Sequence, residues 1–319
     1  MKILIAGELN VDLVLQNYSS FPALGREVLI EDVSLTLGSS SAICASALAK
    51  LGDQVTFIGK LGCDSWGDLC IGSLTSTGVD CSQIIRDPLL KTGITVSVTA
   101  HHDRALMTYL GSIEKLRAEE VSDPCLKVCD HLHVSSFFLQ RGLRPELRTL
   151  LARARANGLT TSLDPGFDPT ETWGADLIET LTEVDVFLPN EIELEAITGR
   201  ENRADALRAL DNGRTLVVAK LGREGCMSIQ NRKIITLPAF PVVPIDTTGA
   251  GDSFNAGFLH AWLRREGLEE AMRFGAACGA LSTLGTGGVA SQATEAQARQ
   301  FIAEHESRQT IGSGTGVSA

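Results

Sequence analysis

The chain has 319 residues and a formal net charge of −11, from 39 Asp and Glu against 28 Lys and Arg. Its 44% hydrophobic and 21% charged residues are typical of a globular protein with a sizeable core, and they exclude a disordered chain or a coiled coil. The acidic balance argues against a nucleic-acid partner, because neutralising phosphates requires clustered Lys and Arg. A membrane partner is not expected either, since no apolar run approaches the roughly 18 residues of a membrane span.

The N-terminal segment 1–7 is predicted to form the first strand of the fold. Its apolar stretch is too short for the hydrophobic region of a signal peptide, and polar residues follow at once. Eight cysteines are scattered along the chain without any C-x-x-C pair, so neither a zinc ribbon nor a redox centre is indicated. These features favour a cytoplasmic location with reduced thiols.

Short apolar runs alternate with stretches of helical period along the chain. The predicted strands are 2–6, 54–58, 131–135, 160–163, 184–188, 215–220 and 227–230. The predicted helices are 42–50, 67–77, 146–157, 173–182, 191–198 and 203–210. This alternation predicts an α/β fold, a doubly wound and mainly parallel sheet with helices on both faces. Glycines suited to a left-handed helix end follow four of these helices, at Gly52, Gly78, Gly158 and Gly199.

Two segments break this rhythm. Residues 91–110 alternate polar and apolar side chains around a polar turn, which predicts a β-hairpin with one wet face, and residues 11–37 carry similar short pieces. We interpret both as one small β lid over the end of the main sheet, with an edge hairpin that gates nothing as the alternative. The exposed hairpin edge favours a homodimer formed by strand pairing. The predicted division is 1–10, 38–90 and 111–307 for the α/β domain, 11–37 and 91–110 for the lid, and 308–319 for a disordered tail.

A group of Cys125, Cys129, His131 and His133 offers side chains that bind metals. The two histidines would share one face of a strand, which suits a metal site. The interpretation that we favour is the entry of a strand with histidines on its solvent side.

Residues 246–254, Asp-Thr-Thr-Gly-Ala-Gly-Asp-Ser-Phe, carry the most informative pattern. A strand-like run at 241–245 precedes them and an amphipathic helix follows, with Gly267 as its stop. Small residues at such a strand-to-helix turn expose successive N–H groups, those of Gly249, Ala250 and Gly251, where the helix dipole is positive. The turn is therefore a candidate anion-binding site.

Asp252 lies at the same point of the chain, where a carboxylate is not needed to bind phosphate. We interpret it as a base that takes the proton of a hydroxyl attacking phosphate. Its place at a helix start predicts that it stays ionised and is a weak base, which suffices for phosphoryl transfer. An ordinary Asp near the start of a helix after a glycine turn is an equally good reading of the spacing.

This segment resembles the second signature of the ribokinase-like (PfkB) carbohydrate kinase family. Other matches follow the family's order between about Ile3 and Gly288: Gly7-Glu-Leu-Asn10-Val-Asp12, the stretch from Gly38 to Gly52, Gly59-Lys-Leu-Gly62-Cys-Asp64-Ser-Trp-Gly67, Asn190-Glu-Ile-Glu193 and Lys220-Leu-Gly222-Arg-Glu-Gly225. The resemblance implies an ATP-dependent phosphotransferase that acts on a hydroxyl of a small sugar or sugar acid with Mg²⁺. The alternatives kept open are a nucleoside kinase of the same fold and a non-catalytic sugar-binding relative.

The resemblance also implies roles for individual residues. Asp252 would be the catalytic base, and residues 249–251 would form the anion hole. Sugar hydroxyls would be held by Asp12, with Asn10, Gly38 and Ser39 beside it, because a carboxylate accepts from two hydroxyls at once. The nucleotide would lie near Lys220, Gly222, Gly225 and Asn190. Metal roles would fall to Asn190 and Glu193, through water on Mg²⁺, and to Asp246 and the Thr248 carbonyl, on a monovalent cation such as K⁺.

Three positions depart from the family pattern. Ser39 replaces the second glycine of the first signature, Ile43 replaces an asparagine that contacts sugar in many relatives, and Gly166 follows Asp164-Pro165 where an asparagine is usual. Because an isoleucine cannot bond a hydroxyl, Ile43 predicts a substrate with an apolar edge or a missing group there. Arg104, at the lid turn, is a candidate to reach a substrate carboxylate or phosphate, or else a solvated turn residue.

Other reaction classes fit the sequence poorly. The Gly251-Asp252-Ser253 turn resembles the nucleophile site of one esterase class, but no Asp follows Asp252 to orient a histidine base. The phosphate loop Gly-x(4)-Gly-Lys-Ser/Thr is absent, and no Gly-x-Gly-x-x-Gly follows the first strand as a dinucleotide-binding dehydrogenase requires.

Overall fold

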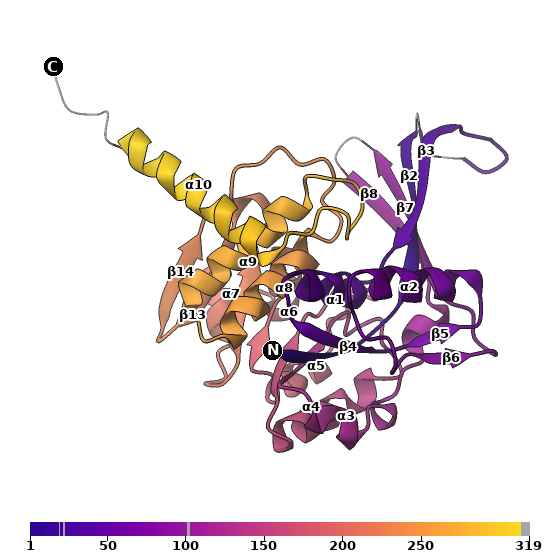
Figure 1. The fold of residues 1–319 in the computed structure, drawn as a ribbon, viewed down its shortest axis with the longest axis horizontal. Coiled ribbons are helices and arrows are strands. Elements are labelled where there is room, and N and C mark those ends of the chain that lie inside the picture. Colours follow the sequence, from indigo (N-terminus) through magenta and orange to yellow (C-terminus); the bar gives the residue numbers. More distant parts are fainter. Residues whose placement is uncertain (19, 22, 101–102, 314–319) are drawn as a thin grey trace.

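The computed structural model describes residues 1–18, 20–21, 23–100 and 103–313, and is shown in Figure 1. Its main sheet has eight strands in the order β14-β13-β12-β11-β10-β9-β1-β4. The six strands β12, β11, β10, β9, β1 and β4 are parallel, and β13 and β14 are added antiparallel at one edge. The strands are β1 (Lys2–Ala6), β4 (Gln54–Ile58), β9 (His131–Val134), β10 (Thr160–Leu163), β11 (Val186–Phe187), β12 (Leu216–Lys220), β13 (Cys226–Gln230) and β14 (Lys233–Leu237).

Helices cover both faces of this sheet, as Figure 1 shows. One face carries α1 (Ser40–Lys50), α2 (Ser65–Ser76), α8 (Ala250–Leu263), α9 (Leu268–Ser282) and α10 (Glu295–Ser313). The other carries α3 (Asp123–Lys127), α4 (Leu147–Ala156), α5 (Ala175–Leu181), α6 (Glu191–Thr198) and α7 (Arg203–Ala209). Within the described residues, none of these helices combines the length and the apolar character needed to cross a lipid bilayer.

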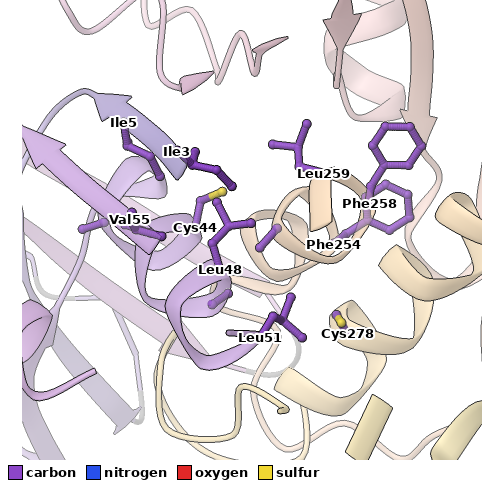
Figure 2. Packing of buried hydrophobic residues seen from close by; sticks show 14 of the residues in the cluster. Ile3, Ile5, Cys44, Leu48, Leu51, Val55, Phe254, Phe258, Leu259 and Cys278 are labelled. Carbon is purple, nitrogen blue, oxygen red and sulfur yellow. The ribbon is translucent and has the colours of Figure 1, made fainter. Parts of the chain in front are cut away.

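Alternate side chains of strand β1, which lies between β9 and β4, enter two separate hydrophobic cores. Ile3 and Ile5 pack with α1 and α8 in the first core, part of which is drawn in Figure 2. Leu4 and Ala6 face the second core, with α4 and α5. A parallel strand that is covered on both faces must be apolar on both, which is why the sequence shows continuous apolar runs. The predicted doubly wound sheet is confirmed.

The predicted elements agree with the observed ones to within about two residues at most ends. The four glycines after helices have positive φ, from 63° at Gly199 to 93° at Gly52. The run 241–245 is wrong as a strand, because Pro241 and Pro244 have no N–H to donate to a ladder. The patterns did not indicate α3, α9, α10 and β14, nor the short elements β5 (Lys60–Gly62), β6 (Ile85–Asp87), η1 (Gly111–Glu114), η2 (Ala118–Glu120), η3 (Arg144–Glu146) and η4 (Gly222–Glu224).

A second sheet of four strands, which we call the lid sheet, projects from the α/β body (Figure 1). Its order is β3-β2-β7-β8, and β2 and β7 pair in parallel although 75 residues or more separate them. The two lid segments of the sequence therefore form one sheet, as predicted. The strands are β2 (Asn10–Tyr18), β3 (Ile30–Leu37), β7 (Gly93–Ala100) and β8 (Asp103–Tyr109).

The C-terminal prediction needs a correction. The backbone of 308–313 continues helix α10 as far as Ser313, so a tail without regular structure does not begin at 308. Gly312 lies in the last turn of this helix, where the low helix propensity of glycine costs little helix stability. Residues 314–319, the remainder of the predicted tail, lie outside the described residues.

His131 and His133 are fully buried, so the prediction that they face solvent is wrong. Both rings join one chain of hydrogen bonds, Thr160–His131–Ser162–His133–Ser135, with contacts of 2.7 to 2.8 Å. Burial lowers the pKa of His131 to about 3 and that of His133 to about 4, so both are neutral. Among the described residues no group of His, Cys, Asp and Glu has the arrangement of a metal site.

Candidate active site

The first turn of α8 lies where the sequence places the anion-binding turn. Gly249 precedes the helix with φ 72°, and a Cβ there would lie 2.9 Å from both the Gly288 Cα and the Ile43 Cγ2. Only glycine fits this position, on both conformational and steric grounds. Among the described residues, the N–H groups of Gly249 and Gly251 have no protein acceptor, whereas that of Ala250 donates to Thr247 O at 3.2 Å. We call the N–H groups of Gly249 and Gly251 the nest.

Asp246 ties together the two loops that flank the nest. One of its carboxylate oxygens accepts the Thr248 N–H and the other accepts the Gly287 N–H, both at 2.8 Å. The backbone of residues 245 and 246 also bonds Thr283 O. Asp246 therefore has a clear structural task, and its role on a monovalent cation, together with that of Thr248, stays a prediction.

Asp252 follows the nest in the first turn of α8, only partly exposed. Burial is the largest cause that raises its pKa, to about 8, and repulsion from Asp164 adds to it. The Lys220 ammonium and a hydrogen bond from the Ser40 side chain act in the opposite direction. The prediction of an always-ionised carboxylate is wrong, because desolvation outweighs the favourable helix dipole here.

Asp164, Lys220 and Asn255 form a closed set of hydrogen bonds behind this turn. The Lys220 Nζ donates to Asp164 Oδ2 at 2.6 Å and to Asn255 Oδ1 at 3.1 Å, and the Asn255 Nδ2 donates to Asp164 Oδ2 at 2.5 Å. Lys220, predicted from the sequence to lie near the nucleotide, is thus bound to two side chains of the protein. Gly166, one of the departures from the family pattern, donates its N–H to Asp164 Oδ1.

The Asn190–Glu193 element forms the capping box of α6. Asn190 Oδ1 accepts the Glu193 N–H at 2.9 Å, and Glu193 Oε2 accepts the Asn190 N–H at 2.8 Å. Glu193 is 4% exposed, and burial followed by repulsion from Asp164 raises its pKa to about 7. The motif has a local structural explanation, so its action on Mg²⁺ through water stays a prediction. Gly222 and Gly225 lie in the turn after β12.

Asp12, on β2, lies on the lid sheet beside the residues predicted with it. The Asn10 Nδ2 donates to Asp12 Oδ1 at 2.9 Å and to Thr95 Oγ1 at 3.4 Å. Thr95 in turn bonds Thr108 at 3.1 Å, so hydroxyls and a carboxylate line one face of the sheet. A Cβ on Gly38 would overlap Asp12 Oδ1, so this glycine allows the close approach. The backbone of Arg104 belongs to β8.

The departures at residues 39 and 43 have structural explanations. Ser39 has φ 74°, the conformation that the family's glycine adopts without cost, and it caps α1 by accepting the Ala42 N–H. Its hydroxyl also donates to Glu8 O at 2.6 Å. Ile43 is 3% exposed and packs against Gly249 and Gly288, so its predicted contact with substrate is wrong in this structure.

Glu8 is a buried carboxyl that sequence reasoning missed. It accepts hydrogen bonds from the Ser41 hydroxyl at 2.5 Å, from the Ser41 N–H at 3.2 Å and from the Ser136 hydroxyl at 2.9 Å. Burial raises its pKa. The only signal in the sequence is a glutamate directly after a buried strand. Glu8 holds the first turn of α1, which presents Ser40 to Asp252 and Ile43 to Gly249 and so connects the nest with the lid side of the site.

Comparison with known proteins identifies the family of the chain. A family model described as pfkB family carbohydrate kinase matches residues 1–295. An ATP-dependent ribose-1-phosphate kinase of Halopiger xanaduensis is 31% identical over 306 residues (95% of this chain and 99% of that protein), and a ribokinase of Haemophilus influenzae is 29% identical over 310 residues (94% and 98%). The chain belongs to the pfkB family of carbohydrate kinases, and the resemblance seen in the sequence is confirmed.

The fold of the family is also present in solved structures. The crystal structure of a putative ribokinase II from E. coli in complex with ATP and Mg²⁺ superposes with a TM-score of 0.85 at 23% identity, covering 95% of this chain and 99% of that one. This likeness confirms the predicted ribokinase-like architecture of a large α/β sheet with a smaller second sheet. Family membership makes the protein a sugar kinase.

Proposed function

We propose that this protein transfers the γ-phosphoryl group of ATP to a hydroxyl of a small sugar or sugar acid, with Asp252 as the base. The observation that carries the proposal is the partly buried Asp252 carboxyl beside the two unpaired N–H groups of the nest. The names of the related proteins, a ribose-1-phosphate kinase and a ribokinase, support a sugar as the acceptor, and the ATP and Mg²⁺ complex of the E. coli protein supports the donor.

The chemistry requires one proton transfer and one exchange of bonds to phosphorus. The substrate oxygen bonds to the γ-phosphorus, the bond from that phosphorus to the β–γ bridging oxygen breaks, and ADP leaves with the electron pair. Ionised Asp252 takes the hydroxyl proton, and the Gly249 and Gly251 N–H groups stabilise charge on the phosphoryl oxygens. Because the pKa of Asp252 is about 8 in the free protein, activity should rise with pH toward that value.

Sugar recognition is assigned to the lid sheet. Asp12 accepts from two sugar hydroxyls, and Asn10, which donates both to its carboxylate and to the Thr95 hydroxyl, holds that carboxylate in place. The lid sheet covers the sugar and excludes water that would otherwise accept the phosphoryl group. Ser39 and Gly38 shape the base of this pocket, since both adjoin the start of α1.

Cations and nucleotide are assigned to the opposite end of the site. Mg²⁺ on the nucleotide phosphates would neutralise their charge, and Asn190 and Glu193, whose side chains each accept the other's backbone N–H, would act on it through water rather than directly. A monovalent cation would take the Thr248 carbonyl and Asp246. Gly222 and Gly225 follow β12 at its carboxyl end, where nucleotides bind in open α/β sheets, and we assign Lys220, the last residue of β12, to the phosphoryl end of the nucleotide.

The protein is further proposed to be a cytoplasmic homodimer that associates through the lid sheet. Support comes from one face of that sheet, where Leu13, Leu35, Val96 and Met107 form a cross-strand row. Leu35 is 43% and Met107 is 56% exposed in the single chain. An apolar face of this kind is typical of a subunit interface. The eight cysteines are free, which suits a reducing compartment.

A screen of ADP release identifies the acceptor. Purified protein with ATP and Mg²⁺ is tested against pentoses, hexoses, sugar acids, ribose 1-phosphate and nucleosides. We expect turnover that depends on a sugar. Turnover with nucleosides alone would favour the nucleoside kinase, and ATP binding without any turnover would favour the non-catalytic relative.

Asp252→Asn tests the base with the acceptor that the screen identifies. Removing the proton acceptor should lower kcat about 10²-fold or more and leave the Kd of ATP within a few-fold. Asp205→Asn, which changes an exposed aspartate on α7, is the matched control and should keep full activity. An Asp252→Asn variant with nearly normal kcat would show that another group takes the proton.

A further inference from the structure

The set formed by Asp164, Lys220 and Asn255 joins three elements at one point. Asp164 follows β10, Lys220 ends β12, and Asn255 lies in the second turn of α8. The ion pair is well shielded, with the Lys220 side chain 12% and the Asp164 side chain 6% exposed. Asn255 bonds both partners, so the position of the ammonium is fixed from two sides.

The ammonium of Lys220 lies next to Gly251 of the nest. A Cβ built on Gly251 would be 3.7 Å from Lys220 Nζ and 3.8 Å from its Cδ. Gly251 and Asn255 are four residues apart on α8 and so share one face of the helix, the face that Lys220 contacts. The cation is therefore held against the first helical turn, next to the N–H groups that would meet a phosphoryl group.

Lys220 also retains bonding capacity. An ammonium has three N–H groups, and the structure pairs two of them within the described residues. Carboxyl groups surround it, since Asp164, Glu193 and Asp252 all raise its pKa. A buried charge with one donor unpaired is costly unless it serves an acceptor that arrives during function.

We propose that Lys220 is a catalytic cation that acts on the phosphoryl group during transfer, and that Asp164 and Asn255 are the positioning residues that hold it behind the nest. Lys220 then adds a full positive charge to the two N–H groups at the moment when negative charge develops on the transferring group. This role differs from that of a lysine that binds the nucleotide equally before and during the reaction, which would change KM and not kcat. The inference rests on the proposed function of the nest and Asp252.

Two variants test the proposal with the acceptor that the screen identifies. Lys220→Met should lower kcat about 10²-fold with the KM for ATP and for sugar within about threefold. It should also lower the Tm, because Asp164 is left buried without its partner. The double variant Lys220→Met/Asp164→Asn removes both charges, so its Tm should recover toward the wild-type value while kcat stays as low as in Lys220→Met.

The double variant separates catalysis from stability. Recovery of kcat together with Tm would show that the pair is only structural and would overturn the proposal, as would a rise in the KM for ATP at unchanged kcat. The matched control is Arg214→Met/Asp185→Asn. It removes a partly exposed ion pair at the amino-terminal ends of β11 and β12, away from the nest, and should leave kcat unchanged.

The pH profile of kcat/KM gives a second readout. Asp164 raises and Lys220 lowers the pKa of Asp252, so Asp164→Asn should move the acidic limb to lower pH and Lys220→Met should move it to higher pH. Glu8 also raises this pKa and is unchanged in both variants. Shifts of the acidic limb in the same direction in both variants would contradict the proposed positions of Asp164 and Lys220 around Asp252. Failure of the proposed function would appear differently, as absence of turnover in the wild type or full activity of Asp252→Asn.

Discussion

Two opposing effects meet at the Asp252 carboxyl. The start of α8 favours a negative charge, as do the Lys220 ammonium and the Ser40 hydroxyl, whereas burial and the nearby Asp164 disfavour it. Burial wins, and the pKa rises to about 8. A base with this pKa is stronger than an exposed aspartate, which suits removal of a proton from an alcohol near neutral pH. The cost of this arrangement falls on the stability of the folded protein.

That cost can be measured as a function of pH. Asp252 ionises near pH 3.8 in the unfolded chain and near pH 8 in the folded protein. Protonated Asp252 therefore makes its full contribution to the free energy of unfolding below pH 3.8, and this contribution is lost as the pH rises toward 8. Asp252→Asn removes this dependence. We expect its free energy of unfolding, relative to wild type, to increase between pH 4 and pH 8 and then to level off, measured by urea unfolding. Parallel curves for the two proteins would contradict the raised pKa.

Residue patterns predicted the members of the site better than their partners. The turn at 249–252 and the carboxylate of Asp12 follow from local spacing and from the family resemblance. The bonds of Asp164 to Lys220 and Asn255 join residues 56 and 91 positions apart, and no local pattern encodes such pairs. Glu8 was missed for the same reason, because its three donors come from Ser41 and Ser136.

At the scale of elements, close packing of α8 on α9 positions the first turn of α8, which carries the nest. A Cβ on Gly275 would lie 2.9 Å from Phe254 O, and one on Gly279 would lie 3.1 Å from Ala250 O. The glycines of α9 thus contact the backbone of α8, including its first turn. Phe254 and Phe258 of the same helix enter the core shown in Figure 2, so α8 is both a core helix and the carrier of the nest.

A pair of glycine substitutions tests this packing. Gly275→Ala should destabilise the protein by about 1–3 kcal/mol, because the added methyl group meets backbone atoms of α8 that cannot move freely. Gly72→Ala, on the exposed side of α2, meets no atom within 4 Å and should stabilise by about 0.5–1 kcal/mol through higher helix propensity. Urea unfolding measures both changes. Equal effects at the two positions would contradict the inferred close contact.

Periodicity predicted most strands and helices of the sheet because these carry their own local signal, but it did not indicate the long helices α9 and α10. It failed where hydrogen bonds to distant residues determine the local structure or the burial of a side chain. Residues 241–245 are apolar enough for a strand but contain two prolines, and Ile245 donates its N–H to Thr283 O instead. His131 and His133 have polar side chains on a strand covered on both faces, and the hydroxyls of Thr160, Ser162 and Ser135 make their burial possible.

At the scale of the whole molecule, the lid sheet has two dissimilar faces. One carries Asp12, Thr95 and Thr108, and the other carries the row of Leu13, Leu35, Val96 and Met107. On the second face Val11 and Leu37 pack into the first core, whereas Leu35 and Met107 stay exposed in the single chain. This two-sided composition is the reason that we assign the homodimer contact to the lid sheet.

A lysine placed on one face or the other tests which face of the lid sheet forms the dimer contact. Leu35→Lys should convert the homodimer to a monomer, because a lysine would be buried without a partner at the interface. Leu106→Lys, on the opposite face of the same sheet at a position 54% exposed, is the matched control and should leave the dimer intact. Sedimentation velocity measures both. A wild-type protein that sediments only as a monomer at micromolar concentration would contradict the assignment.

The location of α8 has a consequence for how such an enzyme can change over generations. The apparatus for phosphoryl transfer is built into a densely packed helix, where almost any exchange of side chains weakens the whole fold. The groups that we assign to recognition of the acceptor lie mainly on strands of the lid sheet, of which β8 is the most exposed to solvent, and replacements at exposed positions cost little stability. New acceptor preferences are therefore most readily obtained, in nature or in a laboratory library, by diversifying β2, β7 and β8 while α8 is left untouched.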